Sequence, residues 1–311
     1  MSRAVLITGA TGKQGGSVVN ALLRANADFQ ILALTRDAAG ASAQRLLQKS
    51  PKIKLVVGNM DAAEDIFAKA QEASSLPIWG VFSVQTAIGN GASAQSEERQ
   101  GKALIDAALK FGVKHFVYSS VDRGGPARSD KDPTTVPHFV SKYNVEKHLF
   151  DKTKSRQNTD AAMNWTVLRP VAFFENLVPG FLGKVFASSW ARSLDKGQKL
   201  QLVATSDIGF FAAEAFLKPE RYANAKLSLA GDELTYDQFR AVFQQTLGYP
   251  LPTTFSFVAG LVNWMVKDLG LMFRWFHDVG YGADIAALKQ INPGLKDFRT
   301  WLETESQFKK S

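Results

Sequence analysis

VLITGATGKQGG, residues 5–16, places Gly9, Gly12 and Gly15 directly after a short apolar run. The apolar run predicts a buried β-strand, and the glycines lead into the helix that follows it. Glycine permits a tight turn and lets backbone N–H groups approach a diphosphate with no Cβ in the way. The segment therefore predicts a dinucleotide-binding strand–loop–helix unit, with a purely structural turn as the alternative.

The polar residues of this loop complete the expected phosphate site. We expect cofactor contacts from Thr11, Lys13 and Gln14 as well as from the glycines. The first turn of the following helix adds N–H donors and the positive end of the helix dipole. A Walker A loop is excluded, because only two residues separate Gly9 from Gly12 and because Gln14 stands where a serine or threonine would bind magnesium.

The end of the second expected strand indicates which dinucleotide is bound. An NAD-binding fold carries an acidic residue about 20 positions beyond the glycines, where it binds the ribose hydroxyls. This chain has Arg36 there, which can form charge-assisted hydrogen bonds to a 2′-phosphate, and Lys13 adds a second positive charge. The sequence thus predicts NADP(H) as the cofactor. Asp37 opposes this interpretation, and a solvated surface arginine is the alternative.

Short apolar runs alternate with helical patterns over the first 170 residues. Gly101–Phe111, for example, has apolar residues at helical spacing. Near-continuous apolar runs are typical of strands buried on both faces, so we predict an α/β fold with a Rossmann-type, doubly wound parallel sheet. The expected strands are Ala4–Thr8, Phe29–Thr35, Lys54–Gly58, Gly80–Val84, His115–Ser119 and Trp165–Leu168.

The pattern changes after residue 170, where segments become longer, more aromatic and less regular. We therefore predict an NADP-binding domain over 1–170 and a smaller, mainly helical domain over 171–311 on the substrate or partner side. Doubly wound folds often return strands to the first sheet, and Lys226–Ala230 is a strand-like run. Val121–Pro137 is rich in Gly, Pro and charge, which predicts a flexible loop.

Ligands of doubly wound folds lie outside the carboxyl ends of the strands. Asn59 and Asp61 follow the third expected strand and should lie near the adenine. The residues after the fourth strand should contact the nicotinamide ribose, with ordinary loop residues as the alternative in both places. These residues are Ser83, Val84, Gln85 and Thr86.

Several motifs in this order resemble the NmrA-like family, a group of atypical short-chain dehydrogenase/reductases. The resemblance extends from Val5 to Leu302 and implies an NADP-binding Rossmann domain followed by a smaller C-terminal domain. Family members include regulators that sense NADPH and NADP+, and relatives include quinone and phenylpropanoid reductases. The motifs include TGATGKQG at 8–15, HFVSKYNVEKHL at 138–149, LRPVAFFENL at 168–177 and VGYGADIAALKQINPGLKDFRTWL at 279–302.

The resemblance implies catalytic positions that this chain only partly fills. Typical short-chain dehydrogenases have a Tyr-x-x-x-Lys pair on one helix face, in which the lysine holds the ribose and lowers the tyrosine pKa. Lys142 matches the lysine, but His138 replaces the tyrosine, and Tyr143 would face about 100° away from Lys142. His138 is either a general acid or a structural residue. Ser119 and Ser120 match the region of the family's catalytic serine.

The segment after the sixth strand is where the resemblance places the substrate pocket. Phe173, Phe174 and Asn176 stand there, and two aromatic rings could line a site for a flat apolar ligand. Packing in the core is the alternative. The four histidines lack metal-ligand spacing, so we predict no metal site.

Composition restricts the function classes further. The chain has 311 residues, a formal net charge of +8 and no cysteine, which excludes disulfides and thiolate chemistry. The positive net charge suits a dinucleotide that carries three phosphates. Direct binding of nucleic acid is not expected, because the lysines and arginines are spread along the chain and no nucleic-acid-binding motif is present. Neither a signal peptide nor a membrane span is expected, which predicts a cytoplasmic or nuclear protein that does not bind membranes.

Two functions remain open from the sequence. In the first, the protein senses NADPH and NADP+ and signals to a protein partner, which the replacement of tyrosine by His138 favours. In the second, it is an NADPH-dependent reductase of a small apolar carbonyl compound such as a quinone or enone, which Lys142 and the aromatic segment favour. The sequence does not indicate the oligomeric state.

Overall fold

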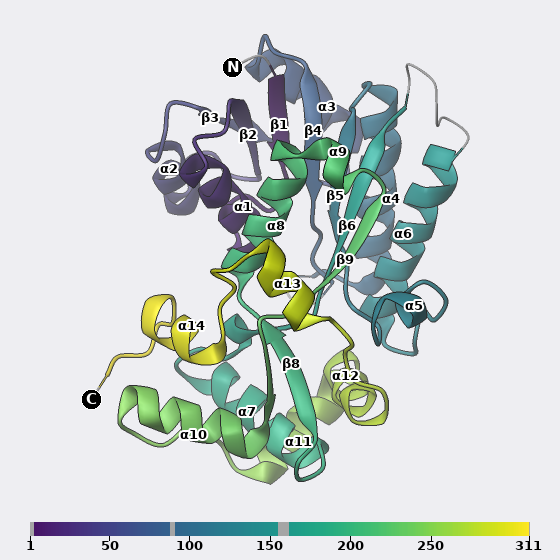
Figure 1. Ribbon diagram of the computed structural model, residues 1–311. Coiled ribbons are helices and arrows are strands. Elements are labelled where there is room, and N and C mark those ends of the chain that lie inside the picture. The colour runs from purple at the N-terminus through teal and green to yellow at the C-terminus, as the bar shows by residue number, and fades with distance from the viewer. Residues whose placement is uncertain (1–2, 88–90, 155–161, 311) are drawn as a thin grey trace. The chain divides into compact units, whose positions relative to one another are not determined.

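The structure is a computed structural model that describes residues 3–87, 91–154 and 162–310, and the chain divides into two compact units (Figure 1). The chain passes between the two units several times: it leaves the first unit at 121–139, again after residue 168 and finally after residue 227. The first unit consists of 1–120, 140–168 and 208–227, and the second consists of 121–139, 169–207 and 228–311.

The first unit is built on a seven-stranded sheet in the order β3-β2-β1-β4-β5-β6-β9. The pairings from β3 to β6 are parallel, which confirms the predicted Rossmann-type, doubly wound sheet. All six expected strands are present, because runs of apolar residues buried on both faces are strong strand signals. The strands are β1 (Arg3–Ile7), β2 (Phe29–Thr35), β3 (Ile53–Val57), β4 (Ile78–Ser83), β5 (His115–Ser119), β6 (Asn164–Pro170) and β9 (Ala225–Leu229).

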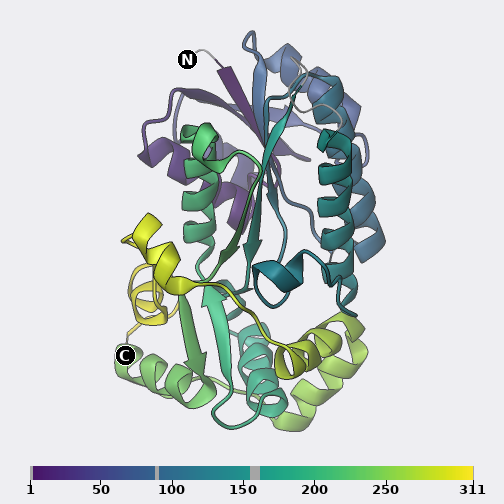
Figure 2. The same cartoon turned by 45° about the vertical axis from the view of Figure 1, so that its right-hand side comes forward.

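Helices cover both faces of this sheet. Figure 2 shows α1 and α8 on one face and α4 and α6 on the other. Close approach between neighbouring helices depends on small residues, since a Cβ at Gly209 of α8 would lie 2.5 Å from the Ser17 backbone of α1. The helices of this unit are α1 (Lys13–Arg24), α2 (Ala41–Leu47), α3 (Ala63–Ala73), α4 (Ala94–Lys110), α6 (Pro137–Lys154), α8 (Thr205–Leu217) and α9 (Pro219–Tyr222), of which α6 and α8 begin in the second unit.

The second unit has a small sheet and many helices. Its strands β7 (Ala172–Phe173), β8 (Lys199–Val203) and β10 (Asp232–Thr235) pair in the order β10-β8-β7. The aromatic residues noted in the sequence form its core, where Phe298 stacks on Phe239 with ring centroids 4.2 Å apart. The helices are α5 (Pro126–Ser129), η1 (Phe174–Asn176), α7 (Phe181–Ser193), α10 (Tyr236–Leu247), α11 (Ser256–Met265), α12 (Lys267–Asp278), α13 (Ile285–Ile291) and α14 (Phe298–Thr304).

The segment Val121–Pro137 is anchored more firmly than its composition predicts. It contains the short helix α5 and two fully buried charged residues, Asp122 and Arg123. The Asp122 carboxylate accepts hydrogen bonds from the backbone N–H groups of Gly124, Gly125 and Gly282. The prediction of a flexible loop overlooked this network, because composition does not reveal that a charged side chain will be buried with partners.

No helix within the described parts of the chain is both long enough and apolar enough to cross a membrane on its own. Helices α11 and α12 are long and apolar enough only when taken together, and the two helices meet at a bend of 113°.

Candidate functional site

The three glycines of the loop after β1 serve three different purposes. Gly9 has a φ of +60°, a conformation that other residues rarely adopt, and a Cβ there would lie 2.9 Å from Val84 Cγ1. A Cβ at Gly15 would lie 2.4 Å from the carbonyl oxygens of Thr8 and Gly9, so Gly15 lets α1 pack against the end of β1. Gly12 is exposed, and a Cβ there would meet only the Gly9 carbonyl oxygen, at 3.2 Å. Gly12 therefore faces open space rather than protein.

The beginning of α1 is suited to an anion. Gly12 is its N-cap residue and has no side chain to cap the helix, and the first turn contains no acidic residue. The first N–H groups of any helix lack acceptors within the helix, and the helix dipole adds partial positive charge. These features match what a diphosphate requires.

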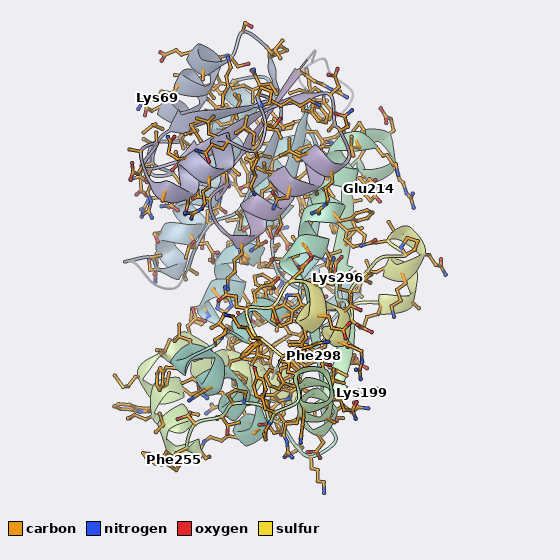
Figure 3. All side chains as sticks on the ribbon, turned by 90° about the vertical axis from the view of Figure 1, so that its left-hand side faces the viewer. Lys69, Lys199, Glu214, Phe255, Lys296 and Phe298 are labelled. Atoms are coloured by element: carbon orange, nitrogen blue, oxygen red, sulfur yellow. The ribbon has the colours of Figure 1, made fainter. Side chains whose placement is uncertain are left out.

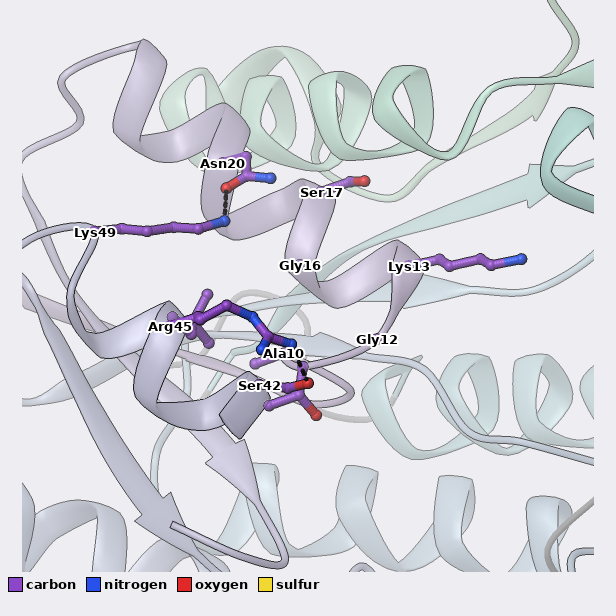
Figure 4. Close-up of a pocket in the computed structure, with 11 residues that line it drawn as sticks. Ala10, Gly12, Lys13, Gly16, Ser17, Asn20, Ser42, Arg45 and Lys49 are labelled. Carbon is purple, nitrogen blue, oxygen red and sulfur yellow. Dashed lines mark hydrogen bonds between the residues drawn. The ribbon is translucent and has the colours of Figure 1, made fainter. Parts of the chain in front are cut away.

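A hollow of about 380 Å³ lies beside this loop (Figure 4). Lys13, Arg45 and Lys49 contribute positive charge to it, and none of the described residues that line it is acidic. Two of these cations are hydrogen-bonded: Arg45 Nη2 donates to Ser42 Oγ at 3.0 Å, and Lys49 Nζ donates to Asn20 Oδ1 at 2.7 Å. The hollow can therefore accept a phosphate group in addition to the diphosphate.

Arg36 is exposed immediately after β2, as expected, although it is not among the residues that line the hollow. Asp37, the residue that opposed binding of a 2′-phosphate, has a local structural role. Its Oδ1 accepts a hydrogen bond from the Ala39 N–H at 2.9 Å, and its backbone N–H donates to Thr35 Oγ1 at 3.2 Å. The carboxylate thus stabilises the turn that leads into α2.

Asn59 and Asp61 are exposed after β3, and both participate in protein contacts. Asp61 accepts hydrogen bonds from Arg99 at 2.8 Å and from Gln100 at 3.0 Å, and Asn59 Oδ1 accepts from the Asp61 N–H at 3.2 Å. The hydrogen bond from the Arg99 guanidinium lowers the pKa of Asp61. The role of both residues at the adenine stays a prediction.

The residues after β4 divide into structural and accessible positions. Val84 is tied to β1, because its N–H donates to Thr8 Oγ1 at 2.8 Å and its carbonyl accepts from the same hydroxyl at 3.1 Å. Ser83 and Gln85 are buried and hydrogen-bonded to each other at 2.9 Å, whereas Thr86 is exposed. Thr86 is therefore the side chain of this group that is most available to a ligand.

Lys142 lies in a network that connects α6, α4, β5 and the glycine loop. Its Nζ is 3.0 Å from Glu97 Oε1 of α4 and donates to the Ser119 carbonyl oxygen at 3.3 Å. The Ser119 hydroxyl in turn donates to Gln14 Oε1 at 2.6 Å. Glu97 is fully buried and also accepts a hydrogen bond from the Ser141 hydroxyl. Lys142 is thus connected to Gln14 through Ser119, while Ser120 bonds to Glu146. The role of Lys142 at the cofactor stays a prediction.

His138 has a carboxylate partner that sequence reasoning did not identify. Its Nδ1 is hydrogen-bonded to Asp268 Oδ1 of α12, within the second unit, and its side chain is mostly buried. His138 and Lys142 lie four residues apart on α6, as the spacing predicts. A carboxylate on Nδ1 orients the ring.

The three residues expected to line a substrate pocket have different environments. Phe174 is fully buried and stacks on Phe298 and Trp301, with ring centroids 5.5 Å apart in both cases, so its ring is part of the core. Phe173 is half-buried on β7, and Asn176 is exposed at the end of η1. Only the latter two have side chains that reach solvent.

Sequence reasoning missed four residues of these sites: Arg45, Lys49, Glu97 and Asp268. Arg45 lies in the last turn of α2 and Lys49 lies two residues beyond its end, and both line the hollow. Glu97 and Asp268 are distant in sequence from Lys142 and His138, and no local pattern connects them.

Comparisons with known proteins agree with this geometry. The model of the NmrA-like family matches residues 1–302. An NmrA-like family domain-containing oxidoreductase of Aspergillus flavus, lnaB, is 33% identical, with 94% of this chain and 92% of the relative aligned.

Two solved structures are similar in fold. NmrA, described as a negative transcriptional regulator and solved with NADP, gives a TM-score of 0.67 at 18% identity, covering 98% of this chain and 96% of its own. An NADPH-dependent quinone oxidoreductase of Escherichia coli gives a TM-score of 0.68 at 20% identity, covering 96% of this chain and 98% of its own.

Proposed function

The chain belongs to the NmrA-like family, and we propose that its first unit binds NADP(H). The observation that carries this proposal is the cationic hollow beside an uncapped helix N-terminus and the exposed Gly12. The glycine loop and the first turn of α1 would hold the diphosphate, since a Cβ at Gly12 would occupy the space where backbone meets ligand. The N-terminal half of the chain thus fits the group that the family implies.

Arg36 and Arg45 would distinguish NADP(H) from NAD(H). Arg36 follows β2 directly and Arg45 lies in the last turn of α2, while the carboxylate of Asp37, the neighbour of Arg36, is engaged in its own turn. A charge-assisted contact to a 2′-phosphate is absent when NAD(H) binds. We expect Arg36→Ala or Arg45→Ala to weaken NADP(H) binding at least tenfold, while NAD(H) binding changes little.

Arg24→Ala is the matched control, because Arg24 is an exposed arginine in the last turn of α1, at the other end from the phosphate loop. Isothermal titration with both cofactors measures all three variants. An equal loss of NADP(H) affinity in Arg24→Ala would show a general effect of charge. An unchanged preference for NADP(H) over NAD(H) in both test variants would refute the role of Arg36 and Arg45.

We propose further that the protein is a redox-responsive regulator, which signals the NADPH/NADP+ state to a protein partner. His138 replaces the tyrosine of the usual catalytic pair and is bonded to Asp268, while Lys142 is paired with Glu97. Position 138 therefore offers an imidazole, bonded to a carboxylate, where the usual pair has a phenol. The description of the similar NmrA structure as a transcriptional regulator supports the same role.

A sensor must respond differently to the two redox states, because a ligand shifts an equilibrium only by its differential affinity. Hydrogen exchange with saturating NADPH and with saturating NADP+ tests this directly. We expect the two states to differ in protection within Val121–Pro137, the segment between β5 and α6. Identical protection throughout the chain, together with equal affinities, would refute the regulator.

A reductase is the second candidate, and the names of relatives favour it. The relative lnaB is called an oxidoreductase, and the similar Escherichia coli structure is an NADPH-dependent quinone oxidoreductase. NADPH would supply the hydride, Lys142 would hold the ribose, and His138 would deliver a proton to the developing alkoxide or enolate. The half-buried Phe173 and the exposed Asn176 would contact a flat carbonyl substrate.

NADPH oxidation against a panel of quinones and enones separates the two functions. Steady turnover that falls at least tenfold in His138→Ala, with NADPH affinity unchanged, would establish the reductase. Asp268→Asn should then lower the rate as well, because the carboxylate orients the ring. No turnover with any compound leaves the regulator as the function.

A further inference from the structure

Helix α11 turns its large apolar residues toward solvent. Phe257, Leu261, Trp264 and Met265 follow the spacing i, i+4, i+7 and i+8, which places them on one helix face. Their exposed fractions are 70%, 52%, 79% and 68%. A helix in a globular protein normally buries such a stripe, so this face has no partner within the described parts of the chain.

The small residues of α11 fix this orientation. Ala259 is fully buried, and a Cβ at Gly260 would lie 3.2 Å from the guanidinium carbon of Arg192 on α7. Asn263 Oδ1 accepts a hydrogen bond from the Ser189 hydroxyl of α7 at 3.0 Å. These contacts hold one face of α11 against α7, so the opposite face, which carries the large apolar residues, points to solvent.

The exposed face continues onto neighbouring segments. Phe255 is 74% exposed and stacks on Phe257 with ring centroids 5.8 Å apart, and it lies at the edge of this unit in Figure 3. Phe255 also lines a hollow of about 440 Å³ with Phe181 and Lys184. We call the whole surface the aromatic face; it consists of Phe181, Phe255, Phe257, Leu261, Trp264 and Met265.

The size of the aromatic face is unusual for a monomer's surface. Phe181 is 56% exposed, and a fully exposed large apolar side chain offers roughly 200 Å², so the six exposed fractions together give a total of roughly 800 Å². The largest apolar patch of a typical monomer measures about 300–600 Å². An apolar surface of this extent marks a place of contact.

The charges on the same segments are all positive. Residues 177–194 and 248–267, which contain the aromatic face, include Lys184, Arg192 and Lys267 but no Asp or Glu. The acidic residues that directly follow the two ranges, Asp195 and Asp268, are each paired with a histidine. A two-fold contact of this face with a second copy would bring these cations together. An anionic surface complements them instead, and aromatic and aliphatic residues flanked by lysine and arginine are typical of helices that lie in a lipid interface.

We propose that the aromatic face binds peripherally to anionic phospholipid membranes. The ten residues of α11 reach about 15 Å, half of the roughly 30 Å hydrocarbon core, so the helix lies on the membrane and does not span it. The bend of 113° between α11 and α12 also prevents one straight span. This inference departs from the expectation, drawn from composition, that the protein does not contact membranes.

Co-sedimentation with lipid vesicles tests the proposal. The full-length protein should sediment with vesicles of phosphatidylcholine mixed with phosphatidylserine, more weakly with phosphatidylcholine alone, and less as salt is added. The double variant Phe257→Ala/Trp264→Ala should lose at least tenfold in partitioning, and so should Lys184→Glu/Lys267→Glu. Leu47→Ala on α2 is the control, since it removes another exposed apolar side chain, 38% exposed, outside this face.

These substitutions leave no cavity, because the replaced side chains face solvent, and circular dichroism verifies that the variants fold. The proposal is overturned if the protein sediments with neither kind of vesicle, or if Phe257→Ala/Trp264→Ala sediments like the unaltered protein. It is also overturned if light scattering shows a dimer that Trp264→Ala dissociates while vesicles are not bound. In that case a second copy covers the face.

Discussion

His115 should make the stability of the first unit depend on pH. It is fully buried at the beginning of β5 and stacks on Trp79 with ring centroids 5.8 Å apart. Its Nε2 is 3.0 Å from Thr166 Oγ1, and that hydroxyl donates to the Tyr222 carbonyl oxygen, so Nε2 carries the hydrogen and donates. Nδ1 has no hydrogen-bond partner among the described residues. A second proton would thus be buried without an acceptor, and burial lowers the pKa of His115 to about 4.

The size of the effect follows from linkage. The unfolded chain binds this proton with a pKa near 6.5, so between about pH 6.5 and 4 the unfolded state holds more protons than the folded state. The stability that the neutral ring contributes is present above pH 6.5 and is lost as the pH falls through 4. Between pH 7 and pH 5 the loss is about 2 kcal/mol, and it approaches about 3 kcal/mol below pH 4.

Urea unfolding of the unaltered protein and of His115→Phe measures this contribution. Phenylalanine keeps the volume and the stacking on Trp79, and Thr166 keeps its bond to the Tyr222 carbonyl. All other titrating groups are common to both proteins. The difference between their free energies of unfolding therefore changes from pH 7 to pH 5 only through His115. We expect the variant to gain about 2 kcal/mol relative to the parent at pH 5. An unchanged difference at the two pH values would refute the depressed pKa.

Three further predictions follow from particular contacts. Gly12→Val should stay folded by circular dichroism, because a Cβ meets only the Gly9 carbonyl at 3.2 Å, but it should lose at least tenfold in cofactor affinity by titration calorimetry; retained affinity would show that the loop is only a turn. Asp207→Asn should remove a pH dependence of opposite sign, because burial raises the pKa of Asp207 to about 6. The free energy of unfolding of the unaltered protein should therefore fall by about 3 kcal/mol as the pH rises from below 4 to above 6. A variant whose stability in urea shows the same pH dependence would contradict this. Glu97→Gln should cost roughly 3 kcal/mol in urea unfolding, because it leaves the mostly buried Lys142 without its carboxylate; a stability equal to that of the parent would show that the pair is dispensable.

The sequence predicts the sheet of the first unit well because its signals are local. Each strand is a run of apolar residues, and both faces of the sheet are covered by helices, so periodicity and burial agree. The glycine loop is equally local: the positive φ of Gly9 and the close packing at Gly15 are backbone requirements that only glycine meets.

Contacts between distant segments could not be predicted in this way. Glu97 precedes Lys142 by 45 residues, and Asp268 follows His138 by 130 residues, so the fold alone brings each pair together. Burial of polar groups is similarly hidden, as the anchoring of Asp122 in a segment expected to be flexible shows. The outward face of α11 is hidden too, because its apolar spacing is the same as that of a buried helix.

Binding of NADP(H) by the first unit is the central claim, and isothermal titration of the full-length protein with NADPH and NADH tests it most directly. The cationic hollow and Arg36 predict that NADPH binds at least tenfold more tightly, a difference of about 1.4 kcal/mol. Calorimetry that shows equal affinities for NADPH and NADH, or heat of binding for neither, would contradict the account.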